Sequence, residues 1–427
     1  MLKTLLENVY LYRNGCWSRQ CVSIADGRIE NISPNIIQSG FSKIYQLDGY
    51  YLSPGFTDVH THLREPGFLM KETMATGTRA AARGGYTALC AMPNLSPVPD
   101  CRENLQVELC AIQKDAVVDV FPYGAITKGQ KGEQLADLEG MAGDVIGFTD
   151  DGRGVQHEEL MRQAMHEANR LDKLIAAHCE DDTLLRGGYI HDGAYAKAHG
   201  HRGISSESEW RQLARDLNLV RETDCRYHVC HVSTKESVAL IRQAKEQGLR
   251  VSCETAPHYI ALCDMDLEEH GRFKMNPPIR SKEDQEALIE GILNGTIDMI
   301  ATDHAPHTQE EKSKGLAHSA MGVVGLECAF AILYSRLVKP NILRLESLIE
   351  LLTTNPCRVF GLTDGGIEAG AEADLCVLDL DRTYKIDPRR FLSKGRATPF
   401  EGEEVSGDVI LTLKNGKAVW KDEIFTA

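Results

Sequence analysis

Short apolar runs alternate with amphipathic stretches through the central part of this chain, whereas both ends follow a different pattern. From about residue 55 onward, apolar runs are separated by stretches with helical spacing. This alternation is typical of repeated βα units that build a parallel sheet. The eight predicted strands are GFTDVHTHL, GYTALCAMPN, VVDVFPYGAIT, DVIGFTDDG, LIAAHCED, RYHVCHVS, RVSCETAPH and IDMIATDHAPH.

Two of the intervening stretches carry signals for the start or the end of a helix. In residues 234–247, Val238 and Ile241 lie three positions apart, and Gly248 follows as a stop. In residues 281–293, Ser281 and Asp284 form the pattern of an N-terminal capping box. Eight strands that alternate with helices over roughly 250 to 300 residues predict an α/β fold with a (β/α)8 barrel of the TIM type.

The two ends of the chain have the pattern of strands and turns. Residues 1–54 and the segment from residue 363 contain strand-like runs with Asn-Gly or Asp-Gly pairs, which favour hairpins. We therefore expect a barrel over residues 55–362. Residues 1–54 and 363–427 are expected to form the two parts of one small β-sandwich module beside it.

Composition and charge limit the classes of partner. The net charge of −15 argues against a nucleic-acid or anionic-membrane partner, although a few arginines inside a cleft could still bind a small anion. No run approaches the roughly 20 apolar residues of a membrane span, and the first residues lack a secretory signal. The 13 cysteines form no CxxC pair, so we expect reduced thiols in a cytoplasmic protein.

Polar residues gather at the ends of the predicted strands, where a barrel of this type carries its active site. A buried, hydrogen-bonded histidine explains one such residue, but five strands that bring His or Asp to one rim indicate a metal site. His60 and His62 are two positions apart, so both point to the same face of an extended strand. The strand-end residues are His60, His62, Asn94, Asp150, Asp151, His178, His228, His231 and Asp303.

The types of side chain narrow the choice of ion. Imidazoles and carboxylates without thiolates favour Zn²⁺, or Mn²⁺, Co²⁺ or Fe²⁺, over Ca²⁺ and Mg²⁺. Cys179 and Cys230 lie beside candidate ligands, but free cysteines are usually small buried apolar residues. The candidates outnumber the three protein ligands of a single catalytic zinc, so we expect a two-metal centre that shares one carboxylate.

Two strands leave a choice between neighbouring candidates. Asp150 and Asp151 are adjacent and point to opposite faces of a strand, so one of them faces the site, and Asp151 is favoured because it lies nearer the loop. His228 and His231 are three apart and cannot share a face; His231 is favoured as the ligand and His228 as structural. His258 also ends a strand, and we expect it to support the site or the fold rather than to bind metal.

An ordered set of motifs carries a family resemblance. The chain contains DVHTHLREPG, AMPNLSPVPD, FTDDG, AHCED, HVCHVS, KMNPPIR and ATDHAPH in this order. From about residue 45 to residue 402 it resembles the bacterial class I dihydroorotases of the amidohydrolase superfamily. The resemblance implies a zinc-dependent, reversible interconversion of N-carbamoyl-L-aspartate and L-dihydroorotate, the third step of de novo pyrimidine (UMP) synthesis. It also implies a homodimer and an association with aspartate transcarbamoylase.

The resemblance further implies roles for single residues. A hydroxide that bridges the two ions would attack the ring amide carbonyl, and Asp303 would take its proton and return it to the leaving nitrogen. Asp151 would stand where many relatives have a carboxylated lysine. The implied ligands are His60, His62 and Asp303 for one zinc ion, His178 and His231 for a second, weaker site, and Asp151 as the bridge. The implied substrate-binding residues are His62, Arg64, Asn94, Asn276, His307, Met321 and Gly322.

Arg64 follows His62 by two positions and would bind the carboxylate of dihydroorotate with the help of Asn94. A planar guanidinium suits bidentate binding of a carboxylate. If the extended conformation continued past His62, Arg64 would share the face of that histidine. Residues 320–322 read Ala-Met-Gly where the family often has Pro-Phe-Gly, so contacts there would have to use the backbone.

Three other interpretations remain open at this point. Hydantoinases and allantoinases resemble this chain in their metal histidines, but they typically use the lysine bridge and lack an arginine after the HxH motif. A homologue that had lost catalysis and served as a scaffold would lack metal ligands. A barrel with purely structural histidines is the third alternative.

Overall fold

Eight parallel strands form a closed ring in the computed structural model, which describes residues 3–13, 15–363 and 366–425. One group runs β6–β7–β8 and a second runs β15–β14–β13–β10–β9. A bridge between Gly124 and Phe148 joins the two groups, and a bridge between Thr61 and His304 closes the ring. The expected (β/α)8 fold is therefore confirmed. The strands are β6 (Phe56–Thr61), β7 (Tyr86–Ala91), β8 (Asp119–Pro122), β9 (Gly147–Phe148), β10 (Leu174–Ala177), β13 (Arg226–Val229), β14 (Val251–Thr255) and β15 (Met299–Ile300).

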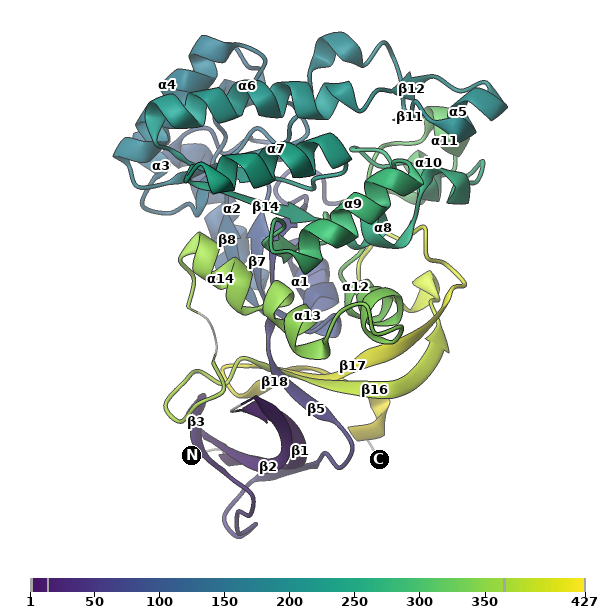
Figure 1. Ribbon diagram of the computed structural model, residues 1–427. Helices are drawn as coiled ribbons and strands as arrows, with labels where there is room; N and C mark the ends of the chain where they lie inside the picture. The colour runs from purple at the N-terminus through teal and green to yellow at the C-terminus, as the bar shows by residue number, and fades with distance from the viewer. Residues whose placement is uncertain (1–2, 14, 364–365, 426–427) are drawn as a thin grey trace.

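Helices cover the outside of the ring, and a short parallel pair, β11 (Ile190–His191) and β12 (Gly203–Ile204), lies in one of the connections (Figure 1). Both helices with sequence signals are confirmed. Thr234 caps α7, and Ser281 caps α9 in a capping box with Asp284. The helices are α1 (Met74–Arg83), α2 (Arg102–Asp115), α3 (Leu138–Met141), α4 (Glu158–Arg170), α5 (Ala194–His199), α6 (Glu207–Thr223), α7 (Lys235–Glu246), α8 (Pro257–Ala261), α9 (Lys282–Leu293), α10 (Gln309–Lys312), α11 (Gly315–His318), α12 (Ala329–Leu333), α13 (Leu345–Leu352) and α14 (Thr354–Phe360).

Strands from both ends of the chain share one sheet, which lies below the barrel in Figure 1. The order is β18–β17–β16–β5–β1–β2–β3, and β4 pairs with β1. β5 lies between β16, to which it is antiparallel, and β1, to which it is parallel. The strands are β1 (Lys3–Arg13), β2 (Cys16–Ala25), β3 (Arg28–Ser33), β4 (Lys43–Gln46), β5 (Tyr51–Pro54), β16 (Leu375–Lys385), β17 (Glu404–Lys414) and β18 (Lys417–Lys421).

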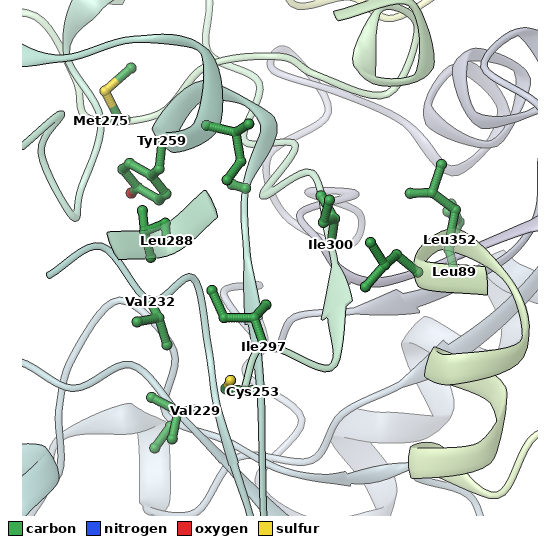
Figure 2. Packing of buried hydrophobic residues seen from close by; sticks show 14 of the residues in the cluster. Leu89, Val229, Val232, Cys253, Tyr259, Met275, Leu288, Ile297, Ile300 and Leu352 are labelled. Atoms are coloured by element: carbon green, nitrogen blue, oxygen red, sulfur yellow. The ribbon is translucent and has the colours of Figure 1, made fainter. Parts of the chain in front are cut away.

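The hydrophobic core has a layer inside the ring and a larger layer between the ring and the helices. Val59, Cys90, Tyr123 and Met299 belong to the inner layer. Figure 2 shows part of the outer layer, where Leu352 of α13 lies near Leu89 of β7 and Leu288 of α9 lies near Tyr259 of α8. Burial of this apolar surface is the main favourable contribution to folding, and it fixes the strands whose ends carry the site.

Polar contacts join the shared sheet to the barrel. Arg83 at the end of α1 donates to Asp408 of β17 at 2.9 Å, and Thr412 donates to the carbonyl of Ala82 at 2.7 Å. Lys414 of β17 binds Asp119 of β8 at 2.7 Å. The sheet therefore supports the end of the barrel opposite the candidate ligands.

The strands end earlier than the apolar runs predict. β6 ends at Thr61, and the backbone turns at Arg64, whose φ is +62°. Similar positive φ values occur at His231 (+35°) and Asp303 (+47°), beyond β13 and β15. Arg64 therefore does not continue the extended face of His62, because the chain leaves the strand before it. Within the described ranges, no helix has the length and apolar content that a membrane crossing requires.

Candidate metal centre

Six of the predicted residues converge at the carboxyl ends of the barrel strands. Each of them is buried, with an exposed fraction of 7% or less. They come from five strands, so closure of the ring brings together side chains that lie up to 243 positions apart. The six residues are His60, His62, Asp151, His178, His231 and Asp303.

One half of the cluster surrounds Asp303. Its Oδ1 lies 3.2 Å from Nε2 of His62 and 3.6 Å from Nε2 of His60. The donor atoms of these three residues lie within 4.8 Å of one another, which is the spacing of a potential ion site.

The other half surrounds Asp151. Its Oδ1 lies 3.4 Å from Nε2 of His60, 3.4 Å from Nε2 of His231 and 3.8 Å from Nδ1 of His178. Its Oδ2 faces Nε2 of His62 at 3.5 Å. Asp151 is thus in contact distance of histidines from both halves.

Asp150 points elsewhere. Its Oδ1 accepts hydrogen bonds from the backbone of Ile126 at 2.9 Å and of Thr127 at 3.1 Å, and its Oδ2 accepts one from the Thr127 hydroxyl. Because these contacts occupy both oxygens, Asp150 fixes the loop after β8, and Asp151 is the carboxylate that faces the histidines.

Two buried carboxylates support this cluster and were missed by the sequence reasoning. Nδ1 of His60 donates to Oε1 of Glu254 at 2.7 Å, which leaves Nε2 of the same ring to face the cluster. Nε2 of His228 meets the other oxygen of Glu254 at 3.0 Å, so His228 supports the site from outside it. Asp58 accepts from the backbone of His60 at 3.0 Å and from the Thr302 hydroxyl at 2.6 Å. Glu254 and Asp58 both interrupt apolar strand runs, and a carboxylate in such a run is the sequence signal that could have identified them.

The donor set fits a metal ion. Nε2 of His60 is buried and has no hydrogen-bond partner among the described residues, although its ring is fixed by Glu254. Nδ1 of His178 lies 2.9 Å from Nε2 of His231, so two ring nitrogens face one another, as they would around a shared cation. A carboxylate partner on the remote nitrogen is the usual arrangement of a histidine that binds metal. Cys230 also lies near His60 and Glu254, and burial raises the pKa of its thiol to about 12.

The electrostatics keep both central carboxylates ionised. Burial by itself raises the pKa of Asp303, but the hydrogen bond with His62 and the nearby His60 ring outweigh it, so the pKa lies below its usual range. The pKa of Asp151 is lowered well below its usual range in the same way: burial opposes the shift, and the His60 and His231 rings cause it. Both groups are therefore carboxylates at neutral pH.

A cationic side chain, that of Arg64, borders the cluster and interacts electrostatically with Asp303 and Asp151. Arg64 is partly buried and donates from Nε to the carbonyl of Pro306 at 3.3 Å. Burial lowers its pKa to about 10, and the carboxylates of Asp303 and Asp151 oppose that shift, so it remains a cation at neutral pH. His307 lies close by, and burial together with the charges of Arg64 and Lys71 lowers its pKa to about 3, which keeps the ring neutral.

The remaining predicted residues lie around the same cluster. Asn94 donates to the carbonyl of Asp151 at 2.7 Å, and Asn276 donates to Glu180 at 3.2 Å. The amide oxygens of both asparagines are buried without a partner in the described part of the chain, so they are available to a ligand. Met321 accepts through its backbone oxygen from His307 at 2.7 Å. Gly322 has a φ of +131°, and a Cβ there would lie 2.8 Å from Ala305.

His258 lies outside this set of contacts. It is buried, and its Nε2 has no hydrogen-bond partner within the described ranges. Burial lowers the pKa of its ring to about 4, so it is neutral, and it packs at 4.2 Å against the ring of Tyr259.

Comparison with known proteins places the chain among related enzymes. The Dihydro-orotase-like family matches residues 49–237, and the Amidohydrolase family matches residues 226–420. A dihydroorotase of Fusobacterium nucleatum subsp. nucleatum is 47% identical over 420 residues, which cover 98% of this chain and 99% of the relative. A dihydroorotase of Bacillus cytotoxicus is 47% identical over 423 residues, which cover 97% and 99% of the two chains.

Solved structures share the fold at lower identity. An L-hydantoinase (dihydropyrimidinase) from Arthrobacter aurescens superimposes with a TM-score of 0.87 at 25% identity, covering 99% of this chain and 96% of its own. A dihydropyrimidinase from Brevibacillus agri gives a TM-score of 0.86 at 24% identity, with the same coverage. These structures support the barrel with its attached sheet.

The contact between Glu254 and His60 leads to a testable prediction. Glu254→Gln keeps the shape but weakens the charge-assisted hydrogen bond that orients the His60 ring. We expect metal affinity to fall about 10- to 100-fold, measured as metal retained during titration with a chelator. The exposed Glu283→Gln is the matched control and should retain metal like the unmodified chain. Equal retention by both variants would contradict the role of Glu254.

Proposed function

This chain belongs to the dihydroorotase family of the amidohydrolases, and we propose that its site interconverts N-carbamoyl-L-aspartate and L-dihydroorotate in pyrimidine biosynthesis. The observation that carries this proposal is the 47% identity with a dihydroorotase over 98% of the chain. Identity with the hydantoinase of the same fold is 25%. The enzyme is a hydrolase that acts on a cyclic amide bond in one direction and closes the ring in the other.

We propose that the centre holds two zinc ions. His60, His62 and Asp303 would bind one ion, and the contacts of Asp303 with both rings support this. His178 and His231 would bind the second, weaker one. Asp151 would bridge the two, which is supported by its contacts with histidines from both halves. When bound, such ions acidify water and polarise the amide carbonyl.

Asp303 is proposed as the general base and acid. Its low pKa makes it a carboxylate in the resting site, so it can accept the proton of the attacking water at Oδ1 or Oδ2. In ring opening it then gives that proton to the ring nitrogen as the carbon–nitrogen bond breaks. In ring closure it accepts a proton from the carbamoyl nitrogen and gives one to the departing oxygen.

Arg64 and its polar neighbours are proposed to bind the carboxylate that dihydroorotate carries outside its ring. Arg64 supplies a fixed charge and a planar donor, and its hydrogen bond to Pro306 supports a defined orientation. Asn94, Asn276 and neutral His307 would supply further polar contacts, as would His62. The backbone at Met321 and Gly322 would complete the wall of the pocket, since it lies against His307.

We also propose a cellular location and an assembly for the enzyme. We propose that the enzyme is cytoplasmic, since its 13 cysteines form no CxxC pair and favour a reducing compartment. We further propose a homodimer that associates with aspartate transcarbamoylase, which supplies the substrate for ring closure. Sedimentation of the purified chain, alone and mixed with that enzyme, measures both assemblies.

A direct assay separates the substrate classes. The purified, metal-loaded protein is expected to turn over dihydroorotate, whereas hydantoin and allantoin should react at least about 100-fold more slowly, because neither neutral ring carries a carboxylate for the Arg64 pocket. Ring opening is followed by loss of ultraviolet absorbance. Preference for hydantoin would contradict the proposed function.

Removal of the proposed base gives a prediction about turnover. Asp303→Asn cannot accept a proton, so kcat should fall by about 10³-fold or more while the fold is kept. Steady-state assays and circular dichroism measure the two quantities. Asp182→Asn, a change at a carboxylate outside the cluster, serves as the control. Near-normal turnover of Asp303→Asn would remove Asp303 from the reaction.

Replacement of the guanidinium gives a prediction about substrate binding. Arg64→Lys keeps a positive charge but loses the planar pair of donors, so KM for dihydroorotate should rise about 10- to 100-fold with a smaller change in kcat. The exposed Arg79→Lys on α1 should behave like the unmodified enzyme. An unchanged KM for Arg64→Lys would exclude a bidentate contact with substrate.

A further inference from the structure

A buried lysine lies behind the proposed substrate pocket, and none of the contacts described above uses it. Lys312 at the end of α10 has an exposed fraction of 2%. Its Nζ donates to three backbone carbonyls: Gly322 at 2.7 Å, Ala320 at 2.8 Å and Lys274 at 2.9 Å. An ammonium group has three donors, so these carbonyls use all of them.

The charge of this lysine has no direct carboxylate partner among the described contacts. The neighbouring carboxylate of Glu311 binds Lys71 at 2.8 Å and accepts from the backbone of Thr308 at 3.0 Å. Burial of an ammonium group without a counter-ion costs free energy, and burial here lowers the pKa of Lys312 to about 7. The three carbonyls favour the protonated form, which has a donor for each of them. A methionine of similar length would fill the same space without this cost. The benefit of a lysine here is therefore its three hydrogen bonds to backbone carbonyls.

The three carbonyls belong to two segments that border the site. Gly322 and Ala320 flank Met321, whose backbone oxygen accepts from His307 at 2.7 Å. Lys274 lies two positions before Asn276 and accepts from the backbone N–H of Gly322 at 3.0 Å. The ammonium group therefore joins the segment 320–322 to the segment 274–276.

We propose that Lys312 is a positioning residue that holds the backbone of residues 320–322 and 274–276 in the geometry that binds substrate. Without it, the buried carbonyls of Ala320 and Gly322 would lose their donor, and Lys274 would keep only the N–H of Gly322. The two segments would then separate or turn toward water. A pocket wall fixed before binding costs less ordering when substrate arrives. This inference rests on the proposed function, because it assumes that these segments contact dihydroorotate.

The kinetic test compares two lysines on the same stretch of chain. Lys312→Met should raise KM for dihydroorotate about tenfold or more, while kcat changes less than about threefold and metal content stays the same. Lys314→Met is the matched control, since the side chain of Lys314 is 49% exposed and lies 4.0 Å from Glu310. Lys312→Gln keeps two donors and should lie between the two. A KM for Lys312→Met equal to that of the control would overturn the proposal.

Hydrogen exchange gives a readout that does not depend on activity. The backbone N–H groups of Ala320 and Gly322 donate to Glu311 and Lys274, both at 3.0 Å. In Lys312→Met, exchange in a peptide over 318–324 should be about tenfold faster, whereas a peptide from α7 should be unchanged. Equal acceleration in both peptides would indicate general destabilisation and overturn a positioning role.

The unmodified protein supplies the remaining control. If Lys312→Met does not fold, the proposal still requires slow exchange of the 320 and 322 amides in the unmodified enzyme without substrate. Rapid exchange there would overturn it. Failure of the proposed function is distinguishable, because the unmodified enzyme would then fail to turn over dihydroorotate whatever the result for Lys312.

Discussion

At the carboxyl end of the barrel, six ionisable side chains share a volume that water barely reaches, and the neighbouring segments are arranged around them. Carboxylates and imidazoles in such a place raise the free energy of the fold unless each finds a partner. Glu254 holds the far nitrogen of His60, and Asp58 fixes the backbone on both sides of the seam where the ring closes. The adjacent Asp150 is fully occupied with the backbone of another loop, so it cannot compete with Asp151. The surrounding hydrogen bonds thus select one arrangement of the six groups.

The same end of the barrel also holds unusual backbone conformations. Arg64, His231 and Asp303 all have positive φ, which side chains other than glycine adopt at some cost. At Arg64 the turn takes the side chain off the face that it would share with His62 in a continued strand. The closed ring and its two core layers hold these turns in place, and the shared sheet supports the ring through Arg83 and Lys414. The packing of the barrel and the shared sheet therefore stabilises the positive-φ turns at the carboxyl end of the strands.

Sequence reasoning succeeded where a local pattern has one physical meaning. The capping box at Ser281, the stop at Gly248 and the alternation of strands and helices predicted the elements and the barrel, because these signals act over a few residues. Polar residues at strand ends also predicted which side chains meet, since parallel strands bring their ends to one rim. The conformation at Arg64 was not predictable, because the end of β6 depends on the bridge from Thr61 to His304. Glu254 and Lys312 were missed because their partners are distant in the sequence or are backbone carbonyls, which have no sequence signature.

The position of β5 in the shared sheet affects how the chain folds during synthesis. β5 ends at Pro54, and its antiparallel neighbour β16 begins about 320 residues later, at Leu375. At translation rates of about 5 to 20 residues per second, one edge of β5 waits roughly 16 to 64 seconds for its neighbour. An unpaired strand edge is a template for wrong pairing with another chain. During this period chaperones can protect the unpaired edge of β5 from wrong pairing. The edge is covered once β16 has been synthesised and pairs with it.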